Sequence, residues 1–259
     1  MNATATRLTA LGRAELTLLG RNRNNLFVAL LMPVLMVFLL RTSLGGMDEG
    51  GLPLGLAEAT AIGGTGMILV LVVYMNLVAT YVARREELVL KRLRTGEARD
   101  TEILFGGALP AAAIALVQCA VLTALGPAAL GAGAPRRPDL LLLGVLAGTG
   151  LLAALAALTT VITRSVESAG LTTLPFFLVS AMGSGLMVPV ESLPDPVASV
   201  CSLLPLSGVM ELVRAGWLGT GGAGGIGGKE LLGAALTTVA WIVLSVFAVR
   251  KWFRWEPRR

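Results

Sequence analysis

Two long apolar runs flank the charged segment Arg84-Arg85-Glu86-Glu87-Leu88-Val89-Leu90-Lys91-Arg92-Leu93-Arg94-Thr95-Gly96. It contains five basic and two acidic residues, and leucines interrupt the charges at positions 88, 90 and 93. On charge alone it could be an ordinary basic loop on the inner side of a membrane. The interleaved leucines favour a helix that binds a soluble protein at the bilayer surface.

The composition of the 259 residues indicates a membrane protein. Hydrophobic residues make up 55% of the chain and charged residues 14%, whereas soluble domains have about 25% charged residues. Several apolar runs reach the ~20 residues that a spanning helix needs. The short alternating segments of a membrane β-barrel do not stand out. The sequence therefore predicts one all-α integral membrane domain over residues 1–259.

Six transmembrane helices are predicted, with one surface helix before them and one charged segment between the second and third. Residues 1–24 combine arginines with a leucine-rich face, a pattern typical of an amphipathic helix on the membrane surface. The segment 84–102 joins the second and third spans. The expected spans are about 25–41, 60–83, 104–130, 139–163, 167–188 and 230–249.

Residues 189–218 differ from the spans on either side of them. Their prolines separate two apolar pieces, 197–204 and 206–218, and neither piece is long enough to cross a bilayer. Half-length apolar segments in a membrane protein are typical of re-entrant structure. We therefore expect an external re-entrant hairpin between the fifth and sixth spans.

The distribution of basic residues predicts the orientation. With both termini in the cytoplasm, 16 of the 21 basic residues lie on the inner side of the plasma membrane. The segment 84–102 is then cytoplasmic and the hairpin external. The five basic residues left on the outer side are Arg41, Arg136, Arg137, Arg214 and Lys229.

Catalytic and cofactor chemistry finds little support in the sequence. The chain contains no histidine, which excludes histidine metal sites and Ser-His catalysis. Residues 222–230 only superficially resemble a phosphate-binding loop, because Ala223 and Glu230 stand where that motif needs glycine and serine or threonine. Cys119 and Cys201 are not expected to pair, and the basic residues sit at span ends instead of forming a nucleic-acid surface. We predict no enzyme activity, no bound metal or cofactor, and no nucleic-acid partner.

Two further patterns lie within the spans. Gly144 and Gly148 form a G-x-x-x-G pattern that permits close helix contact. Charges inside the spans are scarce, which argues against an ion-coupled secondary transporter. Glu167, at the start of the fifth span, is the nearest candidate, and a helix cap or an interface pair with Arg164 suits it better. If coupling ions do not supply the energy, a partner protein must.

Two motifs resemble those of ABC-2 type transporter permeases. Arg85-Glu86-Glu87 with Leu90-Lys91-Arg92-Leu93-Arg94-Thr95 resembles the cytoplasmic signature R-E-x-G-x-L-x-x-L-R-x-T-P, with Leu88 where the family often has glycine. The segment 185–194, followed by Leu204-Pro205-Leu206 and by Glu211 to Arg214, is similar to the segment between the family's last two spans. The resemblance is closest to actinobacterial permeases of the daunorubicin-exporter type.

This resemblance implies a half-transporter that moves a hydrophobic or amphiphilic small molecule outward. Its partners would be a separate ATPase subunit, which binds ATP and Mg²⁺, and a second permease subunit, more readily an identical copy. Export of a lipid or lipid-linked glycan, and a membrane immunity or scaffold protein that transports nothing, remain alternatives. The implied coupling residues are Arg85, Glu86, Glu87, Leu88, Leu90, Lys91, Arg92, Leu93, Arg94 and Thr95, and the implied hairpin residues are Pro189, Glu191, Leu193, Pro194, Pro205, Glu211 and Arg214.

Overall fold

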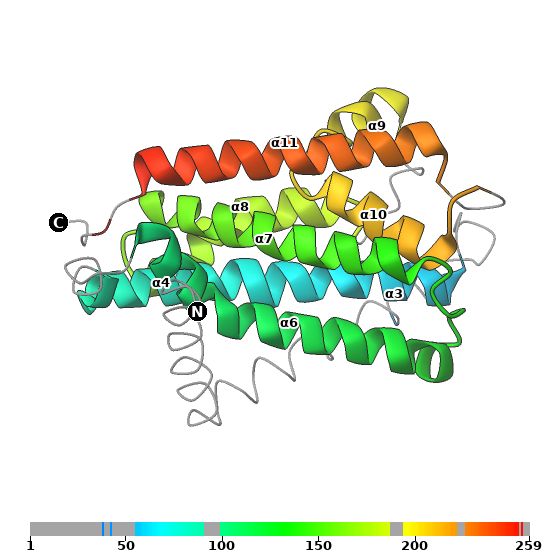
Figure 1. Ribbon diagram of the computed structural model, residues 1–259, viewed down its shortest axis with the longest axis horizontal. Helices are drawn as coiled ribbons and strands as arrows, with labels where there is room; N and C mark the ends of the chain where they lie inside the picture. The colour runs from blue at the N-terminus through cyan, green and yellow to red at the C-terminus, as the bar shows by residue number, and fades with distance from the viewer. Residues whose placement is uncertain are drawn as a thin grey trace, which may run out of the picture.

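The computed structural model describes residues 55–90, 99–186, 194–221 and 226–253, together with Phe38, Thr42 and Trp255. This part of the chain is a bundle of long helices that lie side by side (Figure 1). Its β pairing is limited to one isolated bridge between Thr220 and Ile226. The predicted all-α class is confirmed for the described residues.

Five helical stretches in the described residues are long and apolar enough to cross a membrane, and they correspond to the second to sixth expected spans. The first expected span, 25–41, and the surface helix, 1–24, lie outside the described residues. The elements are α3 (Leu56–Ile68), η2 (Leu69–Met75), α4 (Asn76–Glu86), α6 (Asp100–Leu130), α7 (Pro138–Ile162), α8 (Val166–Gly183), α9 (Asp195–Cys201), α10 (Ser207–Leu218) and α11 (Gly228–Trp252).

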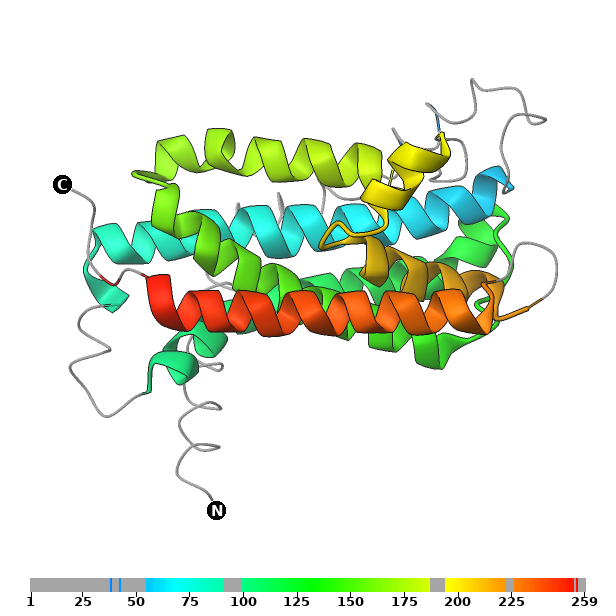
Figure 2. The ribbon, with the colours of Figure 1, turned by 90° about the horizontal axis from the view of Figure 1, so that it is seen from above.

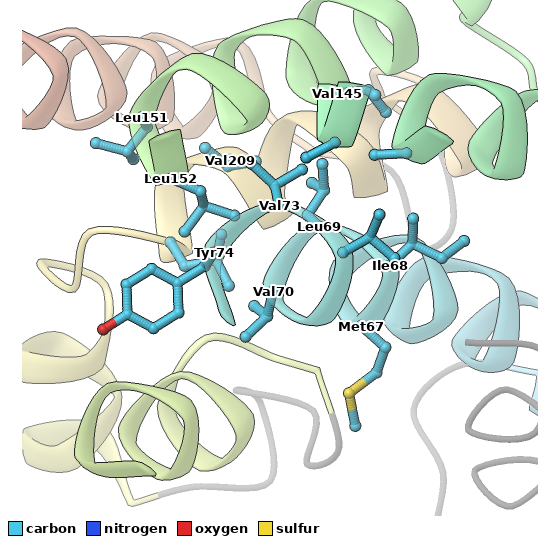
Figure 3. Packing of buried hydrophobic residues seen from close by; sticks show 14 of the residues in the cluster. Met67, Ile68, Leu69, Val70, Val73, Tyr74, Val145, Leu151, Leu152 and Val209 are labelled. Atoms are coloured by element: carbon cyan, nitrogen blue, oxygen red, sulfur yellow. The ribbon is translucent and has the colours of Figure 1, made fainter. Parts of the chain in front are cut away.

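The helices α3, η2 and α4 run on without a break and form the central element of the bundle. The η2 segment is π-helical, with seven residues in wider turns than an α-helix has. Leu69 and Val73 point from it toward Val145 and Val209, which belong to α7 and α10 (Figure 3). In the view of Figure 2, α8 lies above this central helix and α11 lies below it, whereas Figure 1 shows both on one side of it.

Local sequence signals explain several helix ends. Gly131 ends α6 with φ of 75°, a left-handed conformation that glycine adopts at low cost. Pro138 occupies the first turn of α7, where a missing N–H costs nothing. Ser165 caps α8, and its Oγ accepts a hydrogen bond from the Ser168 N–H at 3.4 Å. Arg250 and Lys251 occupy the last turn of α11, where positive charge is favourable.

The bundle has two chemically different ends. At one end, which we call the Arg85 end, α4, α7 and α11 finish and α6 and α8 begin. At the other, the Arg137 end, α7 and α11 begin and α6 finishes. Between them α10 packs antiparallel to α7, with Val213 against Gly144 and Val209 against Gly148. The helix contact expected at these glycines is therefore present, and its partner is the short helix α10.

Candidate functional site

The candidate site is at the Arg85 end, where the last turn of α4 contacts α7. Arg85 is buried, with 1% of its surface exposed. Its guanidinium donates hydrogen bonds to the carbonyl oxygens of Thr160 and Thr163, both at 2.6 Å. The last carbonyls of a helix lack intrahelical donors, and a cation is favourable there. Arg85 therefore caps the C-terminal end of α7 from a neighbouring helix.

The same turn of α4 also contacts α6. The Tyr81 hydroxyl donates a hydrogen bond to the carbonyl oxygen of Leu104 at 2.8 Å. Gly107 leaves room for the Arg84 guanidinium, because a Cβ atom at Gly107 would lie 3.1 Å from Arg84 Nη1. Since Tyr81 and Arg85 reach two different helices, the last two turns of α4 join α6 and α7 at this end.

A sharp turn follows Arg85 and corrects one prediction. The sequence predicts a helix from residue 84 through residue 96, but α4 ends at Glu86 and Leu88 has φ of 59°. The Leu88 N–H donates to the Arg85 carbonyl at 3.1 Å, which closes the turn, and helix resumes at Val89 and Leu90. The continuous helix is therefore wrong, because the left-handed residue redirects the chain.

The structure places five of the ten predicted coupling residues. Glu86, Glu87 and Leu88 are exposed on the turn, whereas Arg85 and Leu90 are buried. The exposed three form the outward surface of this turn. The other five, Lys91, Arg92, Leu93, Arg94 and Thr95, lie outside the described residues.

Hydroxyl groups extend the site from α7 into α8 and η2. The Thr163 and Thr172 hydroxyls share a hydrogen bond at 2.8 Å, which joins α7 to α8. The Tyr74 and Thr159 hydroxyls share another at 2.9 Å, and the Tyr74 ring lies 4.4 Å from the Phe176 ring between centroids. Sequence reasoning missed these residues. A cluster of threonines at the end of an apolar run was the signal that could have found them.

The predicted hairpin residues lie toward the Arg137 end, away from the coupling residues. Pro194 is exposed before α9 and Pro205 lies in the turn before α10. Burial raises the pKa of the Glu211 carboxyl, and the nearby Glu230 carboxylate raises it further. Burial lowers the pKa of Arg214, an effect that Glu230 opposes. Pro189, Glu191 and Leu193 lie outside the described residues.

Two contacts hold this second region together. The Ser207 hydroxyl donates to the Cys201 carbonyl at 2.6 Å, and the Trp241 indole N–H donates to the Leu203 carbonyl at 2.9 Å. Cys119 and Cys201 are both free, as the sequence predicts. This region includes Glu211, Arg214 and Glu230, and α10 lies toward the opposite end of the bundle from α4 (Figure 1).

Comparison with known proteins gives one match. The model of a family described as ABC-2 type transporter matches residues 6–218. The matched range includes the whole Arg85 site and the hairpin, and it ends at the last residue of α10. Comparison with the curated proteins found no match.

Proposed function

Because the chain belongs to the ABC-2 type transporter family, we propose that it is the permease subunit of an ATP-driven exporter. The family's membrane component is a transporter subunit and not a catalytic one, and five apolar helices make this chain a multi-pass membrane protein. The ATP and Mg²⁺ then bind to a separate ATPase subunit. That subunit docks on the coupling segment, 84–96, through the exposed turn at Glu86 to Leu88 and the basic residues after it.

One observation carries this proposal: the Arg85 turn is bonded directly to the helices that it would have to move. A soluble ATPase subunit can drive a permease only if the surface it pushes is attached to the spans. Arg85, in the coupling segment, is attached to α7 through two buried hydrogen bonds, and Tyr81, one turn earlier on α4, is attached to α6 through a part-buried one. The coupling segment is therefore well placed to transmit motion into the bundle.

The Arg85 end faces the cytoplasm in this proposal, and both termini lie there. The excess of basic residues at that end supports the orientation. We also propose a second permease copy as a partner in the plasma membrane. In support, α8 and α11 expose broad apolar faces, with 28% and 17% of their spanning windows buried in the single chain.

We propose a hydrophobic or amphiphilic small molecule, such as a drug or secondary metabolite, as the substrate. The low aromatic content of the chain, 5%, favours this class over lipid-linked glycans, whose exporters tend to have a more aromatic path. Daunorubicin is a suitable first probe because it is fluorescent. ATP-dependent accumulation of daunorubicin in inverted vesicles would support the small-molecule class. Accumulation of a labelled lipid in its place would contradict it.

The docking proposal is tested by purifying the tagged chain from its native membrane. The wild-type chain should bring down an ATP-binding subunit, and Arg92→Glu should lose it, because a charge reversal repels a surface that binds the basic segment. Arg250→Glu is the matched control, since Arg250 is an exposed cation at the same end of the bundle on α11. Absence of any ATP-binding subunit with the wild-type chain would contradict the transporter reading and favour the immunity or scaffold alternative.

A further inference from the structure

We propose that Arg85 is a positioning residue that locks the last turn of α4 to the C-terminal end of α7. A force on the coupling segment then moves both helices together. The inference rests on the proposed function, because it needs an ATPase subunit that pushes that segment. It assigns Arg85 a role inside the chain, in place of the partner contact that the sequence predicts.

Burial is the first argument for an internal role. With 1% of its surface exposed, Arg85 leaves no guanidinium face for a partner to contact. Glu86 and Glu87 are exposed directly after it, so a partner that docks on this turn meets them instead. The charge of Arg85 is satisfied within the chain by carbonyl dipoles at the end of α7.

The geometry of the two hydrogen bonds is the second argument. The guanidinium is a planar fork, and its Nη1 and Nη2 atoms donate to two carbonyl oxygens three residues apart. Hydrogen bonds from a charged donor are stronger than neutral ones, and burial strengthens them further. A fork held at two points fixes the orientation of α7 relative to α4 as well as their separation. A single point of attachment would leave α7 free to rotate about it.

The position of Arg85 along the chain is the third argument. The left-handed turn at Leu88 comes only three residues later. Few residues therefore separate the exposed part of the coupling segment from the two hydrogen bonds of Arg85. Thr163, whose carbonyl accepts a hydrogen bond from Arg85, also shares a hydrogen bond through its hydroxyl with Thr172 on α8. The path therefore runs from the coupling segment through Arg85 to α7 and then to α8.

Arg84 supplies a matched control for Arg85. It carries the same charge one residue earlier, but its guanidinium lies beside Gly107 on α6 and not at the end of α7. If the partner recognises only positive charge on this turn, loss of either arginine should weaken docking to a similar extent. If Arg85 is an internal lock, its loss should leave docking intact and stop the motion of α7.

The experiment measures docking and motion on the same complexes. Cys119→Ala and Cys201→Ser remove the two native thiols, and spin labels are placed on the exposed residues Ile162 of α7 and Phe247 of α11. Pulsed electron paramagnetic resonance then gives the distance between the labels, without nucleotide and with ATP and vanadate. The permease variants are Arg85→Gln, Arg85→Lys and Arg84→Gln. Each is purified with its ATPase subunit, and no transport substrate is needed.

The expected result separates the two arginines. The wild-type chain and Arg84→Gln should show a nucleotide-dependent change in the distance from Ile162 to Phe247. Arg85→Gln should retain the ATPase subunit to within about twofold of the wild type, yet lose most of that change. Arg85→Lys keeps the charge but not the fork, so its change should be smaller than in the wild type.

Each of the following outcomes would overturn the inference. Arg85→Gln could lose the ATPase subunit while its melting temperature stays near that of the wild type, which would make Arg85 a docking contact. Arg85→Gln could show the full distance change. If Arg85→Gln does not fold, Arg85→Lys decides, because a full change in that variant would exclude a role for the fork. Failure of every variant and of the wild-type chain to bind an ATPase subunit would instead overturn the proposed function, and with it this inference.

Discussion

Gly216 of α10 lies directly against the backbone of Leu141 in the first turn of α7. A Cβ atom at Gly216 would be 2.6 Å from the Cα atom of Leu141, closer than two such atoms can approach. Since the obstacle is backbone and not the end of a flexible side chain, the two helices must separate to admit a methyl group. The contact explains how a helix of 12 residues stays packed between long helices.

We therefore expect Gly216→Ala to destabilise the protein. Overpacking of this kind costs about 1–3 kcal/mol, which corresponds to a fall in melting temperature of roughly 2–4 °C per kcal/mol for a chain of this size. Thermal unfolding in detergent measures it. Gly150→Ala on α7 is the control, because nothing lies within 4 Å of its Cβ position and alanine is the better helix former. Equal effects of the two substitutions would contradict the packing argument.

Leu88 adopts a left-handed backbone conformation that costs an ordinary residue about 1–2 kcal/mol. Leu88→Gly removes this strain, although glycine loses about 0.5–1 kcal/mol of additional entropy on folding. We expect a protein as stable as the wild type or more stable, by up to about 1 kcal/mol. Leu88→Val should be clearly less stable, because a β-branched residue tolerates positive φ poorly. The melting temperatures of the two variants test this prediction. A melting temperature of Leu88→Val at or above that of Leu88→Gly would contradict the strain at Leu88.

The raised pKa of the Glu211 carboxyl predicts that the stability of the protein depends on pH. Burial raises its pKa, and repulsion from Glu230 adds to the effect. The folded chain therefore holds this proton more tightly than the unfolded chain does. The contribution to stability is complete below the usual carboxyl pKa and is lost as pH rises through the raised value.

Glu211→Gln should remove that loss and make the protein more stable at neutral pH, by a melting-temperature increase on the order of a degree or two. Melting curves from pH 4 to pH 8 test it, and the gap between variant and wild type should widen as pH rises. Glu86→Gln is the control, because Glu86 is an exposed carboxylate at the opposite end of the bundle. A gap that is constant with pH would contradict the assignment.

The coupling segment shows which structural features can be predicted from the sequence and which cannot. The charges at 84 and 85 predict that the second span ends at residue 83, because an unpaired cation is costly in hydrocarbon. The helix continues to Glu86, since Arg85 is paired with carbonyls of α7, about 75 positions later in the chain. A contact over that distance leaves no trace in local composition. Leucine itself carries no signal for the left-handed turn at position 88, and only the glycine that the resembling signature often has there points to it.

The helix contact at the glycines of α7 is also only partly predictable from the sequence. The spacing of Gly144 and Gly148 predicts a close helix contact, and the structure has one. The spacing does not identify the partner, because any helix with suitable side chains fits a small-residue groove. Here the partner is α10, whose short length and preceding Pro205 predict half a hairpin but not a position against α7. Apolar runs thus predict where the spans lie, whereas the identity of the helix that contacts each span depends on tertiary packing.

Trp241 attaches the hairpin to α11. Its indole N–H donates a hydrogen bond to the Leu203 carbonyl at 2.9 Å, in the turn after α9. Trp241→Phe keeps an aromatic ring but removes the donor, so we expect a loss of about 1 kcal/mol or less. Faster amide hydrogen exchange should be confined to residues 197–206. Trp252→Phe, at an exposed tryptophan that ends α11, should leave this exchange unchanged. Unchanged exchange in Trp241→Phe would mean that the hydrogen bond from Trp241 does not hold the turn.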